Sequence, residues 1–272
     1  MLTLTQINIY PVKSLDGYTV TEAIVERRGL QYDRRWLITD MDGMFMTQRN
    51  NGKMALLRAT IEDNTLIIKE KQNEHNCIKI PIGTEGGKKS DVVVWDDTML
   101  ATHISEEANA WLSDFLEKKC QLVYMPDTTE RQVEAKYNRG ADIVSFADGY
   151  PFLMIGEASM AELNSRLDTP LSIRRFRANF IFAGGTPYQE DDMTHFTIGD
   201  VPFEGVKPCA RCVLTTRDPD SGIKGKEPLA TLTTYRQQGT KILFGQNVIW
   251  DFKKWENVIM PMVRVGDIIK IH

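Results

Sequence analysis

Two of the four cysteines, Cys209 and Cys212, lie three positions apart in the segment "VKPCARCVLTTRDPDSG" at 206–222, and Arg211 stands between them. A neighbouring guanidinium favours thiolate over thiol, and thiolate is the form that ligates soft metals. Free cysteine also packs often as a small buried hydrophobe, which is the alternative interpretation. The pair therefore indicates either a soft-metal ligand or two inert thiols.

Two common uses of a C-x-x-C pair suit this sequence poorly. A structural zinc site takes four Cys or His ligands, commonly as two pairs, but no second pair follows and the four histidines are scattered. A thioredoxin-like dithiol lies where a strand meets a helix, whereas we expect a strand over 213–216. The sequence therefore argues against a zinc site and against a redox dithiol.

Basic residues that could surround a thiolate occur in three other segments. Lys13 follows the first expected strand, Arg34 opens "RRWLITD", and "IRRFRAN" at 173–179 contains three arginines. If that last segment is extended, Arg175 and Arg177 share one face of it. A cavity that collects these cations and a thiolate would suit an anionic cofactor bearing phosphate and a thiophilic metal.

The composition is that of an ordinary globular protein of 272 residues, 42% of them hydrophobic. Its 33 basic and 37 acidic residues give a net charge of −4, which provides no overall attraction to nucleic acid or to an anionic membrane. The N-terminus lacks a signal-peptide pattern, and no apolar run approaches the roughly 20 residues of a membrane span. We therefore expect a soluble, cytoplasmic protein without nucleic-acid or membrane partners. Cys77 and Cys120 are expected to be buried and inert.

Short segments rich in Val, Ile and aromatic residues dominate the chain and predict strands. They are 4–12, 35–40, 65–70, 77–82, 91–95, 121–125, 179–184, 241–250 and 267–272. Tight turns are predicted at Asp42-Gly43, Gly199-Asp200 and Gly266-Asp267. Frequent turns between short strands favour barrels or sandwiches, so the expected fold class is α+β and rich in strands. The polar, turn-rich stretch at 126–142 places a domain boundary in 125–140.

Three helices are expected among these strands. Ser105 can cap a helix over 106–119, whose acidic first turn suits the helix dipole. A second helix covers "ASMAELNSRL", with a capping box from Ser159 to Glu162, and a third begins near Pro228.

Six blocks, in order along nearly the whole chain, carry a specific resemblance. They are "YPVKSL" at 10–15, "YDRRWLITD" at 32–40, "FADGYPFLMIGEASMAELNSRL" at 146–167, "RRFRANFIFAG" at 174–184, "KPCARCVLTTRDPDSG" at 207–222 and "EPLATLTTYR" at 227–236. In these blocks the chain resembles the MOSC-domain proteins, and among them the branch that includes the mitochondrial amidoxime reducing component and its bacterial relatives. The resemblance implies an N-terminal MOSC β-barrel domain with one helix over 1–125. It also implies a MOSC β-barrel domain with peripheral helices over 126–272.

The same resemblance implies a molybdenum cofactor, a pyranopterin dithiolene with a terminal phosphate whose metal also binds one protein cysteine. By its place in the motif this cysteine is Cys212, the implied metal ligand and a catalytic residue, while Cys209 matches a cysteine that does not bind the metal. The implied cofactor-binding residues are Lys13, Ser14, Arg34, Arg177, Asn179, Arg211 and Cys212. Arg211 would add a guanidinium or a backbone N–H beside Cys212. Asp148 is a second catalytic candidate, or else a turn carboxylate that caps backbone donors.

Three positions depart from the family pattern. Ala178 stands where relatives often have Pro, Ala210 where they often have Ser, and Met193 where they place Trp. The first change leaves the backbone less fixed, the second removes a hydroxyl beside the cofactor, and the third would reshape the substrate funnel.

The implied activity is the reduction of N-hydroxylated compounds (hydroxylamines, amidoximes and N-hydroxylated nucleobases) to amines or amidines. The sequence has no cysteine set for a ferredoxin cluster and no Gly-rich nicotinamide fingerprint. We therefore expect an external electron donor, which would be a flavoprotein, a ferredoxin or a cytochrome. A non-catalytic carrier of the cofactor or its sulfur and a cofactor-free interaction module are the alternatives. Detoxification and pyridoxal phosphate binding are further associations of the same family.

Overall fold

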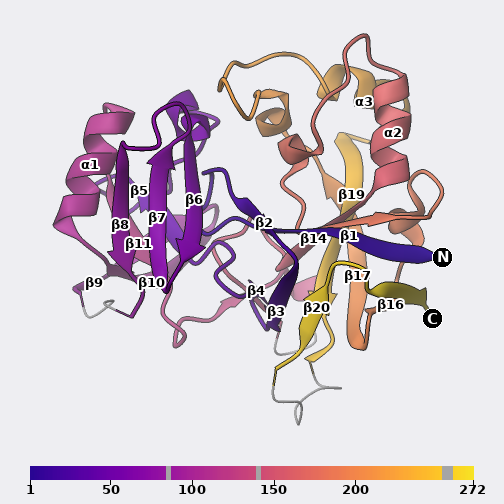
Figure 1. Ribbon diagram of the computed structural model, residues 1–272, viewed down its shortest axis with the longest axis horizontal. Helices are drawn as coiled ribbons and strands as arrows, with labels where there is room; N and C mark the ends of the chain where they lie inside the picture. Colours follow the sequence, from indigo (N-terminus) through magenta and orange to yellow (C-terminus); the bar gives the residue numbers. More distant parts are fainter. Residues whose placement is uncertain (84–86, 139–141, 253–259) are drawn as a thin grey trace.

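Seven strands close into a barrel on one side of the molecule, at the right in Figure 1. The computed structural model describes residues 1–83, 87–138, 142–252 and 260–272. In sheet order the barrel strands are β14 (Phe152–Gly156), β15 (Phe180–Ala183), β1 (Leu2–Ile9), β21 (Ile268–Ile271), β16 (His195–Ile198), β17 (Val201–Ala210) and β19 (Lys241–Trp250). The sheet closes because β19 also pairs antiparallel with β14, which places Val248 opposite Phe152.

Aromatic side chains fill the barrel, because alternate residues of each strand point inward. The rings of Phe152, Phe180 and Phe203 lie with their centroids 5.4–5.5 Å apart. Each is at most 2% exposed, and burying a side chain of this size stabilises the fold by roughly 1.5–3 kcal/mol.

The other side of the molecule is a half-barrel made of two small sheets and a helix, at the left in Figure 1. One sheet orders β5 (Trp36–Thr39), β11 (Gln121–Tyr124), β10 (Asp97–His103) and β9 (Lys89–Val94), and the other orders β6 (Leu57–Glu62), β7 (Thr65–Glu70) and β8 (Cys77–Pro81). Helix α1 (Glu106–Leu116) shares one apolar core with them, in which Leu57, Leu66 and Leu112 are fully buried.

Shorter elements complete the chain. The remaining strands are β2 (Tyr18–Val20), β3 (Glu22–Glu26), β4 (Gly29–Leu30), β12 (Arg131–Gln132), β13 (Ile143–Val144), β18 (Gln237–Gln238) and β20 (Met262–Arg264). The other α-helices are α2 (Glu157–Ser165) and α3 (Leu229–Arg236), and short 3-10 helices are η1 (Gly52–Leu56), η2 (Ala135–Tyr137), η3 (Ile173–Phe176), η4 (Gln189–Asp192) and η5 (Val213–Thr216). None of the helices in the described ranges is long and apolar enough to span a membrane. The cytoplasmic location stays a prediction.

The strand-rich fold class is confirmed, since each of the nine predicted strand segments contains a strand. The turn at Asp42-Gly43 is also confirmed: Gly43 has φ 82°, and Thr39 bridges Phe45 across the turn. The barrel draws on both ends of the chain, because β1 and β2 join the sheet of the second half. The boundary in 125–140 stays a prediction, and residues 139–141 within it lie outside the described part.

Each of the three predicted helices is present at its expected position, but not every predicted N-cap residue is correct. Ser105 caps α1 and accepts a hydrogen bond from the backbone N–H of Ala108 at 3.3 Å. The capping box from Ser159 is wrong, because α2 begins one turn earlier with Gly156 as its N-cap. Ser159 instead donates from Oγ to buried Glu190, 2.7 Å away.

Two segments expected to be extended are 3-10 helices. Residues 213–216 form η5, because the hydroxyls of Thr215 and Thr216 bond back to carbonyls three residues earlier, at 3.0 and 2.8 Å. Residues 173–176 form η3, so the expected shared face of Arg175 and Arg177 is wrong. Arg175 turns away to form an ion pair with Asp218 at 2.8 Å.

The segment between β1 and β2, residues 10–17, crosses from the barrel to the half-barrel. Its backbone pairs with the half-barrel twice: the N–H of Lys13 donates to the carbonyl of Trp36 at 2.9 Å, and the N–H of Asp16 donates to the carbonyl of Leu57 at 3.0 Å. Residues 10–16 are all buried. The predicted site residues in this segment are therefore held where the two halves meet.

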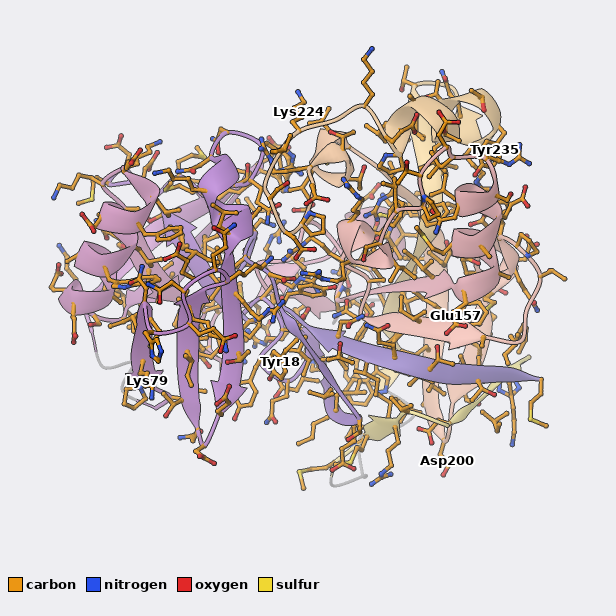
Figure 2. The ribbon with its side chains drawn as sticks, turned by 45° about the horizontal axis from the view of Figure 1, so that its top comes forward. Tyr18, Lys79, Glu157, Asp200, Lys224 and Tyr235 are labelled. Carbon is orange, nitrogen blue, oxygen red and sulfur yellow. The ribbon has the colours of Figure 1, made fainter. Side chains whose placement is uncertain are left out.

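The buried carboxylate of Asp16 forms ion pairs with both sides of this junction. Asp16, whose side chain is 9% exposed, lies 2.8 Å from Lys71 of the half-barrel and 2.6 Å from Arg174 on the barrel side. Arg58 of β6 is a third cation, at 3.3 Å. Burial pushes the pKa of this carboxyl upward, but the cations outweigh burial and lower it to about 2. Tyr18, two residues further along, lies between the two halves in Figure 2.

Asp16→Asn should lower the free energy of unfolding at pH 7 by about 3 kcal/mol, because Lys71 and Arg174 lose their buried carboxylate. The folded pKa of about 2 lies below the ordinary value of 3.8, so this stabilisation is complete above about pH 4 and is lost as the pH falls toward 2. Urea unfolding of both proteins across this range measures the difference.

Asp220→Asn is the matched control, since it removes an exposed carboxylate 2.9 Å from the same Arg174. It should cost less than about 1 kcal/mol. Equal losses in the two variants, or a loss for Asp16→Asn that is the same at pH 2 as at pH 4, contradict the assignment.

Candidate functional site

All eight residues that the sequence analysis assigned to a site line one cleft between the barrel and the half-barrel. They are Lys13, Ser14, Arg34, Asp148, Arg177, Asn179, Arg211 and Cys212. The cleft is open to solvent, and its empty volume including the open mouth is about 820 Å³. The fold therefore brings together segments that lie far apart along the chain.

Lys13 is the most deeply buried cation of the cleft, with a side chain 6% exposed. Its Nζ donates to Asp148 Oδ1 and to the carbonyl of Phe146, both at 2.6 Å. Burial lowers the pKa of Lys13 to about 8, although the Asp148 carboxylate opposes the shift. The charge of Lys13 therefore changes within an accessible pH range.

Two arginines pack on one tyrosine. The guanidinium carbons of Arg34 and Arg177 lie 4.5 and 4.4 Å from the ring centroid of Tyr10. Arg34 also donates to the buried carboxylate of Asp33 at 2.5 Å and to the carbonyl of Arg177 at 2.9 Å. Burial and the neighbouring Arg34 cation lower the pKa of Arg177. Arg177 Nη2 is buried without a hydrogen-bond partner, so it is a donor that a bound anion could satisfy.

Three of the site residues have left-handed backbones: φ is 68° at Ser14, 50° at Arg34 and 56° at Arg177. This conformation costs a non-glycine residue roughly 1–2 kcal/mol, and such strain gathers at functional sites. Backbone bonds hold it in place, since Arg34 N donates to the carbonyl of Tyr10 and Arg177 N donates to the carbonyl of Arg174. The surrounding fold therefore dictates the direction of these side chains.

Asn179 lines the cleft, but its side chain bonds within the protein. It is 1% exposed and donates to the carbonyl of Asn8 at 3.1 Å. Its Oδ1 accepts from Arg34 Nη1 and from the backbone N–H of Leu153, both at 3.2 Å. This geometry gives Asn179 the task of orienting Arg34.

The two cysteines differ in exposure and in partner. Cys212 is exposed, whereas Cys209 is half-buried. Arg211 donates to Cys209 Sγ at 3.0 Å and to the carbonyl of Phe176 at 2.7 Å, and its backbone N–H donates to Ile242. The guanidinium of Arg211 therefore contacts Cys209 and not Cys212, while its role as a cofactor-binding residue beside Cys212 stays a prediction.

Asp148 is 64% exposed to the cleft, yet enough protein surrounds it for burial to push its pKa upward. The cations of Lys13 and Arg49 and a hydrogen bond from Trp95 outweigh burial and hold the pKa well below its usual range. The carboxylate is therefore ionised at neutral pH. In the described structure its oxygens accept from side chains, so it does not act as a cap for turn donors.

Sequence analysis missed two residues of the half-barrel: Arg49, which lines the cleft, and Trp95, which contacts Asp148 of the cleft. Arg49 Nη2 lies 3.4 Å from Cys212 Sγ and 3.6 Å from Asp148 Oδ2. Trp95 Nε1 donates to Asp148 at 3.3 Å. Arg49 lies in a polar run without a strand or helix pattern, so no local signal separates it from a solvated surface charge.

Met193, expected to reshape a substrate funnel, is fully buried in the barrel core and does not line the cleft. That expectation is wrong. A second hollow, with about 1590 Å³ of empty space, lies between the turn at 41–43 and the start of α1. None of the eight predicted residues lines it.

The side chains of the cleft suit an anionic, metal-bearing cofactor. Its basic residues are Lys13, Arg34, Arg49, Arg177 and Arg211, against one acidic residue, Asp148. Arg177 Nη2 and Arg211 Nε are buried without partners. No three His, Cys, Asp or Glu side chains cluster as metal ligands in the part of the chain that the structure describes. Cys212 is the exposed sulfur of this cleft.

Comparison with known proteins covers both halves. Residues 1–119 match the MOSC N-terminal beta barrel domain, and residues 141–270 match the MOSC domain. The chain is 36% identical over 279 residues to mitochondrial amidoxime-reducing component 1 of Mus musculus, which covers 97% of this chain and 81% of the relative. It is 30% identical to the molybdenum cofactor sulfurase of Oryza sativa subsp. japonica, over 89% of this chain and 32% of that protein. Among solved structures, the YUAD protein of Bacillus subtilis covers 99% of the chain and is itself covered to 94%, at 9% identity and a TM-score of 0.41.

The exposed thiol of Cys212 should react with iodoacetamide before that of Cys209, and Cys120, which is 2% exposed, should react last. Access of the reagent to sulfur sets this order. Peptide mass spectrometry over a time course on the folded protein measures it. If Cys209 or Cys120 reacts first, the burial assigned to these thiols is incorrect.

The affinity of the cleft for inorganic sulfate should fall about tenfold between pH 7 and 9, because Lys13 loses its proton with a pKa of about 8. Sulfate carries a constant charge in this range. Isothermal calorimetry of wild type and of Lys13→Arg, whose side chain stays charged, measures the effect. A fall of the same size in Lys13→Arg shows that another group is responsible.

Proposed function

The chain belongs to the MOSC family, and from that premise we propose that it holds a molybdenum cofactor in this cleft and reduces N-hydroxylated compounds. The observation that carries the proposal is the exposed sulfur of Cys212 in a cleft lined by five cations and one carboxylate. Relatives named for amidoxime reduction support the same substrate class.

Each group of side chains has a task in holding the cofactor. Cys212 supplies the soft ligand, which thiolate provides better than oxygen does. Lys13 and Arg177 supply positive charge for a phosphate, and the buried Nη2 of Arg177 gains the partner it lacks within the protein. Asn179 orients Arg34 toward the same region. The arginines lie on a rigid frame, so little ordering is needed when an anion binds.

The reaction consumes two electrons and two protons: the N–O bond breaks, the nitrogen gains one proton, and the hydroxyl oxygen takes the other and leaves as water. When bound, the molybdenum cofactor supplies the two-electron chemistry. The part of the protein is to hold the cofactor and to orient the substrate beside it. Because Asp148 is held ionised by Lys13 and Arg49, it suits a positioning role better than that of a proton donor.

Electrons would come from a separate protein, which we propose to be a flavoprotein, a ferredoxin or a cytochrome. An iron–sulfur cluster takes four thiolates. Cys77 and Cys120 belong to the half-barrel, and they are half-buried and buried. Only Cys209 and Cys212 share the cleft.

A non-catalytic carrier of the cofactor or of its sulfur is the second candidate. The similarity to a relative named molybdenum cofactor sulfurase favours it, and the same side chains would serve a carrier. Turnover separates the two functions, since a carrier binds the cofactor without consuming substrate.

Protein purified from a host that makes the cofactor should contain about one molybdenum per chain and convert benzamidoxime to benzamidine with a chemical reductant. Cys212→Ser should reduce turnover to below about 1% of wild type with the fold retained, because serine oxygen is a poor ligand for a soft metal. Cys209→Ser is the matched control and should keep molybdenum. Metal analysis, product chromatography and circular dichroism measure these quantities.

Wild-type turnover by Cys212→Ser would overturn the ligand assignment. Stoichiometric molybdenum without any turnover in the wild type would favour the carrier. A protein without molybdenum would overturn both candidates.

A further inference from the structure

Arg49 is the cation closest to the sulfur of Cys212 among the contacts described, although 163 residues separate the two along the chain. Its Nη2 lies 3.4 Å from Cys212 Sγ, within the range of an N–H···S hydrogen bond. The neighbouring Arg211 bonds to Cys209 instead, at 3.0 Å. Each sulfur of the pair therefore has its own guanidinium donor.

Two side chains hold the guanidinium of Arg49 in position. Its central carbon lies 4.6 Å from the ring centroid of Trp95, a cation–π contact. The second contact is an ion pair, in which Arg49 Nη2 lies 3.6 Å from Asp148 Oδ2. The same carboxylate accepts from Trp95 Nε1 at 3.3 Å, so Arg49, Trp95 and Asp148 contact one another in a closed set. The side chain of Arg49 is 22% exposed, which limits its freedom further.

The backbone beneath these side chains is also fixed. Arg49 N donates to Thr47 Oγ1 at 3.1 Å, and Asn51 N donates to the carbonyl of Thr47 at 3.0 Å, which closes the turn. Trp95 lies at the tip of the β9–β10 hairpin with a left-handed backbone (φ 57°). Its ring packs against that of Phe45, with the two ring centroids 5.1 Å apart. The half-barrel therefore presents Arg49 to the cleft from a preformed frame.

Resting on the proposed function, we propose that Arg49 is a positioning residue that donates an N–H···S hydrogen bond to Cys212 and so raises the reduction potential of the metal centre. Hydrogen bonds to cysteine sulfur are among the factors that set the potential of thiolate-bound metals. A donor at the sulfur withdraws electron density from the metal and stabilises its reduced state. Arg49 lies in the half-barrel and Cys212 in the barrel, so the first half of the chain tunes a metal held by the second.

Arg49→Gln should lower the molybdenum(V)/(IV) midpoint potential, because the amide cannot reach the sulfur from the same frame. We expect at least a tenfold change in the ratio of reduced to oxidised metal at fixed ambient potential, which is about 59 mV for a one-electron couple. The measurement is a redox titration followed by the electron paramagnetic resonance signal of molybdenum(V), on samples matched for metal content.

Arg175→Gln is the matched control. Arg175 is a partly buried arginine that pairs with Asp218 at 2.8 Å and does not line the cleft. It should leave the potential unchanged. If the Arg49→Gln protein does not take up molybdenum, the Trp95→Leu protein is measured in its place. Trp95→Leu keeps the charge of Arg49 and removes the ring that holds its guanidinium. The midpoint potential of the Trp95→Leu protein should also fall.

The inference is overturned if the midpoint potential is unchanged in whichever of the two proteins, Arg49→Gln or Trp95→Leu, is measured. An equal shift in Arg175→Gln also overturns it, since the effect would then be one of general charge. These failures differ from failure of the proposed function, in which the wild type itself contains no molybdenum or shows no turnover.

Discussion

Five positively charged side chains share one cleft with a single carboxylate, and holding them together against their mutual repulsion is the constraint on which the centre of the molecule depends. A flexible cleft would let such charges swing apart into water. Here the ring of Tyr10, the buried carboxylate of Asp33 and the amide of Asn179 hold two of them. Left-handed backbones at Arg34 and Arg177 add strain that only a rigid surrounding sheet can sustain.

The cleft exists only where the barrel and the half-barrel meet. Residues 10–16 follow β1 of the barrel directly, and the backbone N–H groups of Lys13 and Asp16 donate to the half-barrel. Asp16, three residues later, pairs with cations from both sides of the junction. A ligand between the halves would therefore contact groups whose relative position this buried ion pair helps to fix.

Under the proposed function, this cleft would be the cofactor site of a MOSC-family protein. An exposed sulfur, a rigid set of arginines and unsatisfied buried donors are what a metal-bearing anion requires. The half-barrel contributes Arg49 to the lining of this cleft, and its Trp95 donates a hydrogen bond to Asp148 there. It is therefore part of the site as well as of the scaffold.

The sequence by itself determined the strands, the turn at Asp42-Gly43 and the cap at Ser105, because each depends on alternation or on backbone geometry within a few residues. Motif resemblance also named eight residues that share one cleft. Local pattern failed in two places. Ser159 bonds to Glu190, far along the chain, instead of capping α2. Residues 213–216 form η5 instead of the expected strand, because the hydroxyls of Thr215 and Thr216 bond to carbonyls three residues earlier.

Only the tertiary structure decided which cation meets which sulfur. Sequence proximity favours Arg211 for Cys212, but a side chain's direction depends on the backbone that carries it, and Arg211 turns to Cys209. Arg49 reaches Cys212 from the other half of the molecule. A contact between residues so far apart along the chain is fixed by how sheets and loops pack, which no local pattern of one sequence encodes.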